Sequence, residues 1–231
     1  MIEFNNVSKI YKKEFTAVKN INFKIDNGEF IFIVGKSGAG KSTLIKLLLR
    51  EINPSEGIIL YNGQDITKIR KRNVAEYRRK IGFIFQDYRL LPKMTVYENI
   101  AFAMEMICCT SKNIRREVPL VLSMVGLSDK AKHYPDELSG GEQQRVAIAR
   151  AVINKPETII ADEPTGNLDP DTSKEVMKIL TEVNKRGTTV IMATHDREIV
   201  NLYQKRVIEL KSGAIIRDIK AGGYINEPKK I

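Results

Sequence analysis

Nine consecutive residues near the start of the chain, residues 35–43, could bind a chain of phosphates. They read Gly-Lys-Ser-Gly-Ala-Gly-Lys-Ser-Thr and fit the pattern G-x-x-x-x-G-K-[ST], between an apolar stretch and a helical one. The three glycines allow a tight turn whose N–H groups converge on phosphate oxygens at the positive end of a helix. Lys41 would add a mobile charge for the β- and γ-phosphates, and Ser42 a hydroxyl for Mg²⁺. The weaker interpretation is a glycine-rich turn with an incidental lysine.

Two adjacent carboxylates, Asp162 and Glu163, follow the apolar run at residues 158–161. Strand ends of this kind lie beside the phosphate loop in a parallel nucleotide-binding sheet. Asp162 would hold Mg²⁺ through water, and Glu163 would orient and polarise the attacking water, because phosphoryl transfer needs an aligned nucleophile and neutralised charge. Alone, this pair would be better interpreted as a solvated loop. The phosphate loop reverses that preference.

A third segment could bind an anion at the start of another helix. Residues 138–145 read Leu-Ser-Gly-Gly-Glu-Gln-Gln-Arg, and the paired glycines leave backbone amides open where the helix begins. Ser139 and Glu142 also fit a capping box, in which each side chain bonds to the backbone of the other residue. Both interpretations can hold, because a capped helix N-terminus is also what a phosphate group would meet.

Strands and helices alternate around these groups. The apolar run over residues 28–35 predicts a strand buried on both faces, and helical periodicity follows over residues 41–50. Turn and strand signals predict further strands at 2–11, 17–25, 57–61, 81–85, 158–161 and 188–193, a β-rich region at 206–217 and a helix at 170–186. The first two strands suggest an antiparallel start, and the later alternation is typical of a parallel sheet with right-handed crossovers.

The region from about Tyr97 to Asn154 has a different texture. It shows helical periodicity at residues 96–107, 115–125 and 141–152 and no convincing strand. This pattern predicts a helical lobe inserted into an α/β core. The last residues, 221–231, are expected to form a flexible tail.

The charge balance limits the possible partners. The chain has 38 Lys and Arg residues against 28 Asp and Glu residues, a net charge of +10, and basic residues concentrate over residues 68–80. Such a balance favours nucleic acid or an anionic membrane surface. No aromatic-interleaved RNA motif or zinc finger accompanies the basic residues, so nucleic acid is not expected, and an anionic inner leaflet is the favoured neighbour.

Hydropathy and cysteine content bear on the compartment. The longest apolar stretches, such as residues 30–34, are far short of the roughly 20 residues needed to cross a bilayer. The start of the chain has no basic leader followed by an apolar block, so no export signal is expected. The only cysteines, Cys108 and Cys109, are adjacent and poorly placed to bridge, which fits a reducing compartment. We therefore expect a cytoplasmic protein that does not span a membrane.

The phosphate loop, the Ser-Gly-Gly segment and the carboxylate pair, in this order along the chain, resemble the ATP-binding subunits of ABC transporters. The resemblance covers nearly the whole chain and implies one ABC ATPase domain over residues 1–231, with a parallel α/β core of the RecA-like P-loop NTPase type. Residues 1–90 and 156–220 would form this catalytic core with an N-terminal antiparallel β subdomain, and residues 91–155 an inserted helical subdomain. It also implies an ATPase with ATP and Mg²⁺ as cofactors.

The resemblance further implies that two copies pair head to tail to hydrolyse ATP. In this family the Ser-Gly-Gly segment lies across a dimer interface from the phosphate loop of its own chain. The γ-phosphate held by one copy would therefore be contacted by four residues of the other, Ser139, Gly140, Gly141 and Glu142. ATP would act as glue between the two subunits.

Further site residues follow from the resemblance alone. Tyr11 would stack on adenine with Val18 beside it, and Gln86 would touch Mg²⁺ and sense a membrane partner. His195 would contact the γ-phosphate, and the loop at Asn167 and Asp169 would pass signals between the two ATP sites. The expected ATP-binding residues are Tyr11, Val18, Gly35, Lys36, Ser37, Gly38, Ala39, Gly40, Lys41, Ser42, Thr43 and Gln86. The expected catalytic residues are Lys41, Glu163 and His195, and the expected Mg²⁺ ligands are Ser42, Gln86 and Asp162.

Within the family, residues 78–92 and 95–105 look like the ATPases of bacterial cell division, and residues 192–196 agree with that. This finer resemblance implies a homodimer bound to an integral membrane partner resembling FtsX, which would dock near Gln86 and the helical lobe. It also implies a location on the cytoplasmic face of the membrane, at the division septum. ATP-driven closing of the dimer would then control a peptidoglycan hydrolase, without any transported substrate.

Three alternatives stay open. Lipoprotein-releasing and macrolide-export ATPases share the sequence of residues 161–169, although they tend to differ just after Gln86, where this chain has Asp-Tyr-Arg. A nucleotide-gated scaffold that recruits division proteins would need little hydrolysis, but the intact Glu163 and His195 argue against it. An ABC ATPase acting on DNA or ribosomes is suggested only by the positive charge, because the chain has neither long insertions nor a second cassette.

Overall fold

The computed structural model describes residues 1–11 and 15–223. Two compact units divide the chain, and each is described by itself. Of the described residues, the first unit holds 1–11, 15–26, 30–69 and 191–223, and the second holds 27–29 and 70–190. The tail predicted at 221–231 lies from residue 224 onward outside the described residues. The domain boundaries expected at residues 91 and 155 stay predictions.

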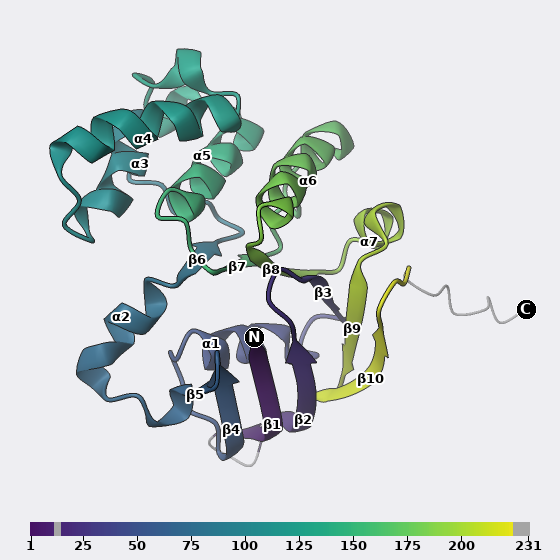
Figure 1. Ribbon diagram of the computed structural model, residues 1–231. Coiled ribbons are helices and arrows are strands. Elements are labelled where there is room, and N and C mark those ends of the chain that lie inside the picture. Colours follow the sequence, from purple (N-terminus) through teal and green to yellow (C-terminus); the bar gives the residue numbers. More distant parts are fainter. Residues whose placement is uncertain (12–14, 224–231) are drawn as a thin grey trace, which may run out of the picture. The chain divides into compact units, whose positions relative to one another are not determined.

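The first unit contains a four-stranded antiparallel sheet in the order β2-β1-β4-β5 (Figure 1). Its strands are β1 (Ile2–Ile10), β2 (Thr16–Ile25), β4 (Glu56–Tyr61) and β5 (Gln64–Asp65). Ile2 lies opposite Ile25 of β2 on one side and opposite Tyr61 of β4 on the other. All three side chains are buried, which fixes the register because a slip by one residue would turn them to the other face. The predicted antiparallel start is confirmed.

The first unit also holds the strand and helix that flank the phosphate loop. All five residues of β3 (Phe30–Val34) are buried, as the apolar run predicts. This strand pairs in parallel with β9 (Arg206–Lys211), which pairs antiparallel with β10 (Ala214–Ile219). Helix α1 (Lys41–Leu48) follows the loop and buries Leu44 and Leu47, and a 3₁₀ turn η1 (Ile66–Lys68) follows β5.

The second unit has a two-stranded parallel pair and most of the helices. Strand β6 (Ile81–Ile84) lies beside β7 (Thr158–Asp162), with Ile81 opposite Thr158. The helices are α2 (Val74–Arg78), α3 (Val96–Glu105), α4 (Ser111–Met124), α5 (Gly140–Val152) and α6 (Pro170–Lys185). Three 3₁₀ turns complete it, η2 (Lys71–Asn73), η3 (Ser128–Lys130) and η4 (Pro135–Glu137).

Helices α3, α4 and α5 lie together and share one buried apolar core (Figure 1). Ile100, Val118 and Val146, one from each helix, are fully buried in it. Among the described residues between 97 and 154 there is no strand, so the predicted helical character is confirmed. Helix α4 begins four residues earlier than predicted, because the Thr110 hydroxyl accepts a hydrogen bond from the Asn113 amide and caps it.

Strand β8 (Thr189–Thr194) carries the chain from the second unit into the first, and helix α7 (Arg197–Tyr203) follows it. All six residues of β8 are buried, as expected of a parallel strand covered on both faces. None of the helices in the described part of the chain combines the length and apolar character that crossing a membrane requires.

Candidate nucleotide-binding site

The phosphate loop forms the turn between β3 and α1 in the first unit, and its shape depends on glycine. Gly40, the residue before α1, has a φ of 111°, in the left-handed region that other residues rarely adopt. A Cβ atom there would lie 2.8 Å from both the carbonyl oxygen of Ala17 and the Cγ1 atom of Val18. Only glycine therefore fits where β2 passes beneath the loop. Val18 is fully buried, so its side chain supports the loop from below.

Lys41 lies at the first position of α1 and points back into the loop. Its side chain is buried, and its Nζ atom donates a hydrogen bond to the Gly35 carbonyl at 2.6 Å. This places a positive charge where the backbone N–H groups at the start of α1 also point. Ser42 is exposed in the same first turn and Thr43 is half-buried. The loop thus gathers an ammonium group, backbone amides and a hydroxyl within a few residues, which suits a chain of phosphates.

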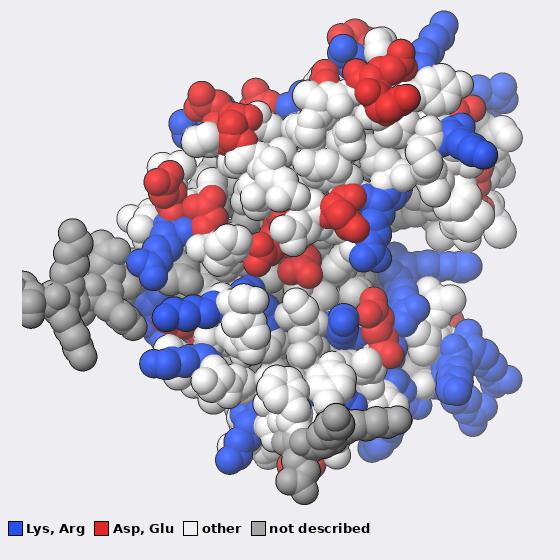
Figure 2. Space-filling model, turned by 180° about the vertical axis from the view of Figure 1, so that it is seen from behind, with Lys and Arg blue, Asp and Glu red and all other residues white. Residues whose placement is uncertain are grey.

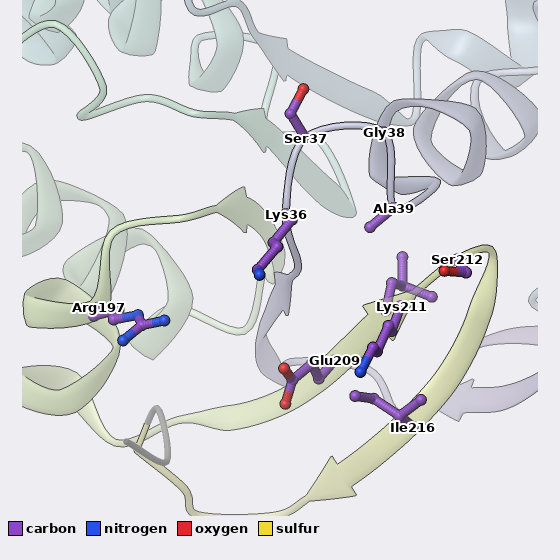
Figure 3. Close-up of a pocket in the computed structure, with 10 residues that line it drawn as sticks. Lys36, Ser37, Gly38, Ala39, Arg197, Glu209, Lys211, Ser212 and Ile216 are labelled. Carbon is purple, nitrogen blue, oxygen red and sulfur yellow. The ribbon is translucent and has the colours of Figure 1, made fainter. Parts of the chain in front are cut away.

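A cavity of about 380 Å³ borders the phosphate loop on the side of the β9–β10 hairpin (Figure 3). Three cations contribute to its wall, Lys36, Arg197 and Lys211. Glu209 also lines it, and this carboxylate forms an ion pair with Arg217 at 3.0 Å. The hairpin turn also bonds to the loop directly, because the Gly213 amide donates to the Ala39 carbonyl at 3.1 Å. The outer face of the loop is therefore a positively charged surface braced by the hairpin.

Tyr11 and His195 belong to the same unit, and both are exposed. The Tyr11 amide donates to the Phe15 carbonyl at 2.9 Å, and the Lys9 ammonium lies 5.5 Å from the centre of the Tyr11 ring. His195 follows β8 directly, and the next residue, Asp196, caps α7. The imidazole is thus attached to a short link between a buried strand and a capped helix.

The Ser-Gly-Gly segment (residues 139–142) begins α5 in the second unit, and its predicted capping box is confirmed. The Ser139 amide and hydroxyl both donate to the Glu142 carboxylate, at 2.8 and 2.9 Å, and the Glu142 amide returns a bond to the Ser139 hydroxyl at 3.3 Å. The bond from the Ser139 amide is the main reason that the pKa of Glu142 is lowered. Ser139 and Gly140 remain exposed, so the capped N-terminus can still meet an anion.

The two carboxylates end β7 and enter a tight turn. Asp162 is its last residue and Glu163 follows with a φ of 49°, a left-handed conformation that costs a residue other than glycine about 1–3 kcal/mol. The Gly166 amide donates to the Glu163 carbonyl at 3.1 Å and closes the turn. Gln86 reaches this turn, because its Nε2 atom would lie 3.5 Å from a Cβ atom on Gly166. Gln86 and the segment after Glu163 are therefore neighbours.

Asp169 has a structural role that the sequence analysis missed. Its carboxylate caps α6 by accepting hydrogen bonds from the Asp171 and Thr172 amides, both at 3.0 Å. The Thr172 hydroxyl also bonds to it and is the largest cause of the lowered pKa of Asp169. An aspartate followed directly by Pro170 is the usual start of a helix, so the signal was present. Asn167, two residues earlier, is exposed.

The segment after Gln86 (residues 86–91, the Gln86 loop) is held by Arg150 and Asn99, two residues to which the sequence analysis gave no role. Tyr88 and Arg89 are both left-handed, with φ of 56° and 48°. Their carbonyl oxygens accept hydrogen bonds from the Arg150 guanidinium on α5, at 2.8 and 2.6 Å. Asn99 on α3 is fully buried, accepts from the Leu91 amide at 2.8 Å and donates to the Leu91 carbonyl at 3.1 Å. The only signal for Asn99 was a polar residue on an apolar helix face.

The same loop approaches the start of α5. The Tyr88 hydroxyl would lie 3.1 Å from a Cβ atom on Gly140, and burial raises the pKa of that hydroxyl. On the other side of the segment, a Cβ atom on Gly141 would lie 2.3 Å from the Thr172 Cγ2 atom of α6. The paired glycines thus allow the Gln86 loop and α6 to pack closely against the N-terminus of α5.

The predicted residues divide between the two units. The first unit holds Tyr11, Val18, residues 35–43 and His195. The second holds Gln86, residues 139–142, Asp162, Glu163, Asn167 and Asp169. Each unit therefore contains one of the two candidate phosphate-binding helix starts, together with part of the remaining chemistry.

Comparison with known proteins defines the class to which these features belong. Residues 18–166 match the family described as ABC transporter. The cell division ATP-binding protein FtsE of Bacillus subtilis is 54% identical over 224 residues, which cover 97% of this chain and 98% of the relative. FtsE of Mycobacterium tuberculosis is 52% identical over 225 residues, with 97% and 98% covered.

A solved structure shows the same fold. It is a dimeric ATP-binding cassette in a post-hydrolysis state, bound to ADP and Pi, and it is 36% identical with a TM-score of 0.87. The match covers 97% of this chain and 100% of the solved one. The chain belongs to the ABC transporter family of ATPases. The predicted fold class, an ABC ATPase with a parallel α/β core and antiparallel strands, is confirmed.

Proposed function

We propose that two copies of this chain bind and hydrolyse MgATP between them and power a cell-division complex with an integral membrane partner of the FtsX type. The observation that carries the proposal is the phosphate loop, in which the buried Lys41 ammonium bonds to the Gly35 carbonyl at the start of α1. A buried lysine at a glycine-rich helix start has little purpose in a binding module without phosphate ligands.

Binding of the adenine and the phosphates is assigned to residues of the first unit. The exposed ring of Tyr11 would stack on the adenine, and the loop amides with Lys41 would hold the phosphates. Ser42 and, through water, Asp162 would bind Mg²⁺, with Gln86 as a further oxygen donor. Hydroxyl, carboxylate and amide oxygens are the donors that Mg²⁺ prefers, and so few protein ligands suit an ion that keeps water and phosphate ligands. When bound, Mg²⁺ would neutralise charge on the phosphates.

Hydrolysis is assigned to Glu163, His195 and Lys41. Glu163 would orient the attacking water, and its left-handed backbone is the kind of local strain that is common at functional sites. His195 would contact the γ-phosphate from the end of β8, and Lys41 would stabilise negative charge there. These groups align and stabilise rather than form covalent bonds, as phosphoryl transfer to water requires.

The second copy would complete each site. The exposed Ser139 and Gly140 at the start of α5 would meet the γ-phosphate held by the other chain, with Gly141 and Glu142 completing the segment. Asn167 and Asp169 would link the two sites across the dimer. Support comes from the related cassette that was solved as a dimer with ADP and Pi.

The membrane partner is proposed from the relatives, which are named as cell division ATP-binding proteins. The Gln86 loop is the proposed receiver, because it is tied to α3 and α5 and its tyrosine lies beside Gly140. The complex would sit on the cytoplasmic face of the membrane at the septum and regulate a peptidoglycan hydrolase. The relatives favour this function over lipoprotein release or macrolide export.

Calorimetry and phosphate release test the proposal together. Lys41→Ala should weaken MgATP binding at least about 100-fold, because it removes a buried charge-assisted contact. Lys46→Ala, an exposed lysine on the same helix, is the matched control and should bind as the wild type does. Glu163→Gln should bind MgATP normally but release phosphate at least about 100-fold more slowly. Wild-type affinity in Lys41→Ala, or rapid turnover by Glu163→Gln, would remove these assignments.

A further inference from the structure

The segment over residues 70–80 differs from the other charged parts of the described chain. It has one carboxylate, Glu76, and six basic residues, Arg70, Lys71, Arg72, Arg78, Arg79 and Lys80. Apart from Arg78, none of these six side chains forms an ion pair or hydrogen bond with any described residue. All of them are exposed except Lys80, which is half-buried. The segment is therefore a concentration of positive charge, and apart from Arg78 its basic side chains have no partner among the described residues.

Some basic residues elsewhere in the described chain pair with a carboxylate, whereas no ion pair is formed by five of the six in this segment. On α6, Lys174 pairs with Asp171 at 2.9 Å and Lys185 with Glu182 at 2.7 Å. In the hairpin β9–β10, Arg206 pairs with Asp218 at 2.7 Å. Uncompensated like charges repel one another and weaken a compact state. A cluster of them without partners is more readily explained by a ligand of opposite charge than by folding.

Local structure holds these cations outward. The segment forms the 3₁₀ turn η2 and helix α2. In α2 the Tyr77 side chain is buried, with 4% of it exposed, and Val74 is half-buried. These apolar residues anchor the segment, while the basic residues on both sides of them remain at the surface. In Figure 2, which shows the molecule from behind, Lys and Arg gather at the lower right, the side to which the turned view brings α2.

We propose that this surface, residues 70–80, binds anionic lipid headgroups directly. Headgroups offer a dense negative surface without fixed geometry, which suits a cluster of exposed basic side chains. Nucleic acid fits less well, because the one aromatic residue of the segment is buried and cannot stack on bases. Helix α2, at five residues, is also too short to read a DNA groove. The proposal goes beyond the proposed function, in which attachment comes only through a membrane protein.

Vesicle co-sedimentation of the full chain tests the proposal without any membrane partner. Wild-type protein should bind vesicles of about 30% phosphatidylglycerol in phosphatidylcholine but not pure phosphatidylcholine. Raising the salt from about 0.1 M to about 0.5 M should weaken this binding at least about tenfold, because salt screens exposed charges. Each basic residue contributes about fivefold, so Arg70→Gln, Lys71→Gln and Arg72→Gln combined should lose on the order of 100-fold.

Two controls separate a specific surface from net charge. The combination Arg70→Lys and Arg72→Lys keeps the charge and should keep the binding. The combination Lys174→Gln, Lys178→Gln and Lys185→Gln removes the same charge from α6 and should change binding less than about threefold. Equal loss in the two Gln triples, absence of binding to the anionic vesicles, or tighter binding to duplex DNA at the same salt would overturn the proposal.

ATP hydrolysis by the same variants separates this inference from the proposed function. All three combinations should hydrolyse ATP at the wild-type rate, since none of the changed residues belongs to the proposed site. A wild-type chain that hydrolyses ATP but does not bind the anionic vesicles would overturn only the lipid surface. A wild-type chain that binds vesicles but does not bind or hydrolyse ATP would overturn only the proposed function.

Discussion

The phosphate loop and the Gln86 loop each follow a buried strand, but they are held in place by different means. The phosphate loop is shaped by its own glycines, by the strand beneath it and by a bond from the Gly213 amide of the β9–β10 hairpin, and its Lys41 side chain bonds to the nearby Gly35 carbonyl. The Gln86 loop is held by side chains from two helices, and one of these, Arg150, lies 61 residues beyond Arg89 in the chain. The first loop takes its shape from its own backbone and the strands beside it, whereas the second depends on side chains of helices α3 and α5.

The difference bears on how the two loops would work. A loop shaped by its own glycines and by adjacent strands keeps its shape independently of α3 and α5, as a binding site for phosphates requires. A loop pinned by Arg150 and Asn99 moves with α5 and α3, and it lies beside Gly140 through Tyr88. Each of the first three predictions below changes one of the two loops and should leave the other intact, and the fourth concerns the start of α5, which the Gln86 loop approaches.

The largest effect is expected from Gly40→Ala in the phosphate loop. The left-handed backbone and the close contacts with Ala17 and Val18 should together destabilise the first unit by about 3 kcal/mol. MgATP affinity should fall at least about 100-fold, measured by calorimetry. Gly38→Ala is the matched control, because Gly38 is also left-handed but a Cβ atom added to it would meet no described atom within 4 Å, so about 1 kcal/mol is expected. Equal effects of the two changes would contradict a loop shaped by its close contacts.

Asn99→Ala should have the next largest effect, and it acts on the other loop. It leaves the half-buried Leu91 amide without its acceptor and removes one of the two donors to the Leu91 carbonyl, which keeps its bond from the Met94 amide. The loss should cost about 2 kcal/mol. Amide exchange should rise across residues 86–95 while residues 35–43 keep their protection. The control is Asn113→Ala, which changes an exposed asparagine on α4 and should alter amide exchange in neither loop. If protection of the phosphate loop fell with that of the Gln86 loop, the two would not be held separately.

Arg150→Gln should have a smaller and more selective effect. The change removes the guanidinium bonds to the Tyr88 and Arg89 carbonyls and costs about 1–3 kcal/mol in the second unit. MgATP affinity should stay within about twofold, because the phosphate loop is untouched, while the rate constant kcat should fall about tenfold. Arg150→Lys keeps the charge without the forked geometry of the guanidinium, so its kcat should lie between those of the wild type and Arg150→Gln. A raised KM at unchanged kcat would contradict this positioning role.

The smallest effect concerns pH and the capping box at the start of α5. Because the Ser139 amide lowers the pKa of Glu142, the ionised carboxylate stabilises the folded state above the unfolded value of 4.5. That contribution, about 1 kcal/mol, should be lost as the pH falls below 4.5 and through the lowered folded pKa. Urea denaturation of Glu142→Gln should show a smaller loss of stability than the wild type over this range. A larger loss in the variant would reverse the sign of the effect.

The same contrast explains what the sequence could and could not predict. The strands beside the phosphate loop, the loop itself and the capping box all depend on neighbouring residues, so their patterns were sufficient. Arg150 and Asn99 could not be assigned because their partners are backbone atoms of a loop without a motif. The left-handed backbone conformations of Glu163 and Tyr88 could not be predicted either, since neither residue type favours that conformation. Asp169 was assigned only a signalling role, although an aspartate directly before Pro170 also predicts the N-cap of a helix.

The central claim is that ATP joins two copies of this chain, and sedimentation of the Glu163→Gln variant tests it most directly. With MgATP the variant should sediment as a dimer, and with MgADP or without nucleotide as a monomer. Ser139→Arg, added to the variant, should prevent the dimer while leaving MgATP binding by each monomer unchanged. A chain that stays strictly monomeric with bound MgATP, and whose wild type hydrolyses ATP at full rate as a monomer, would contradict the claim.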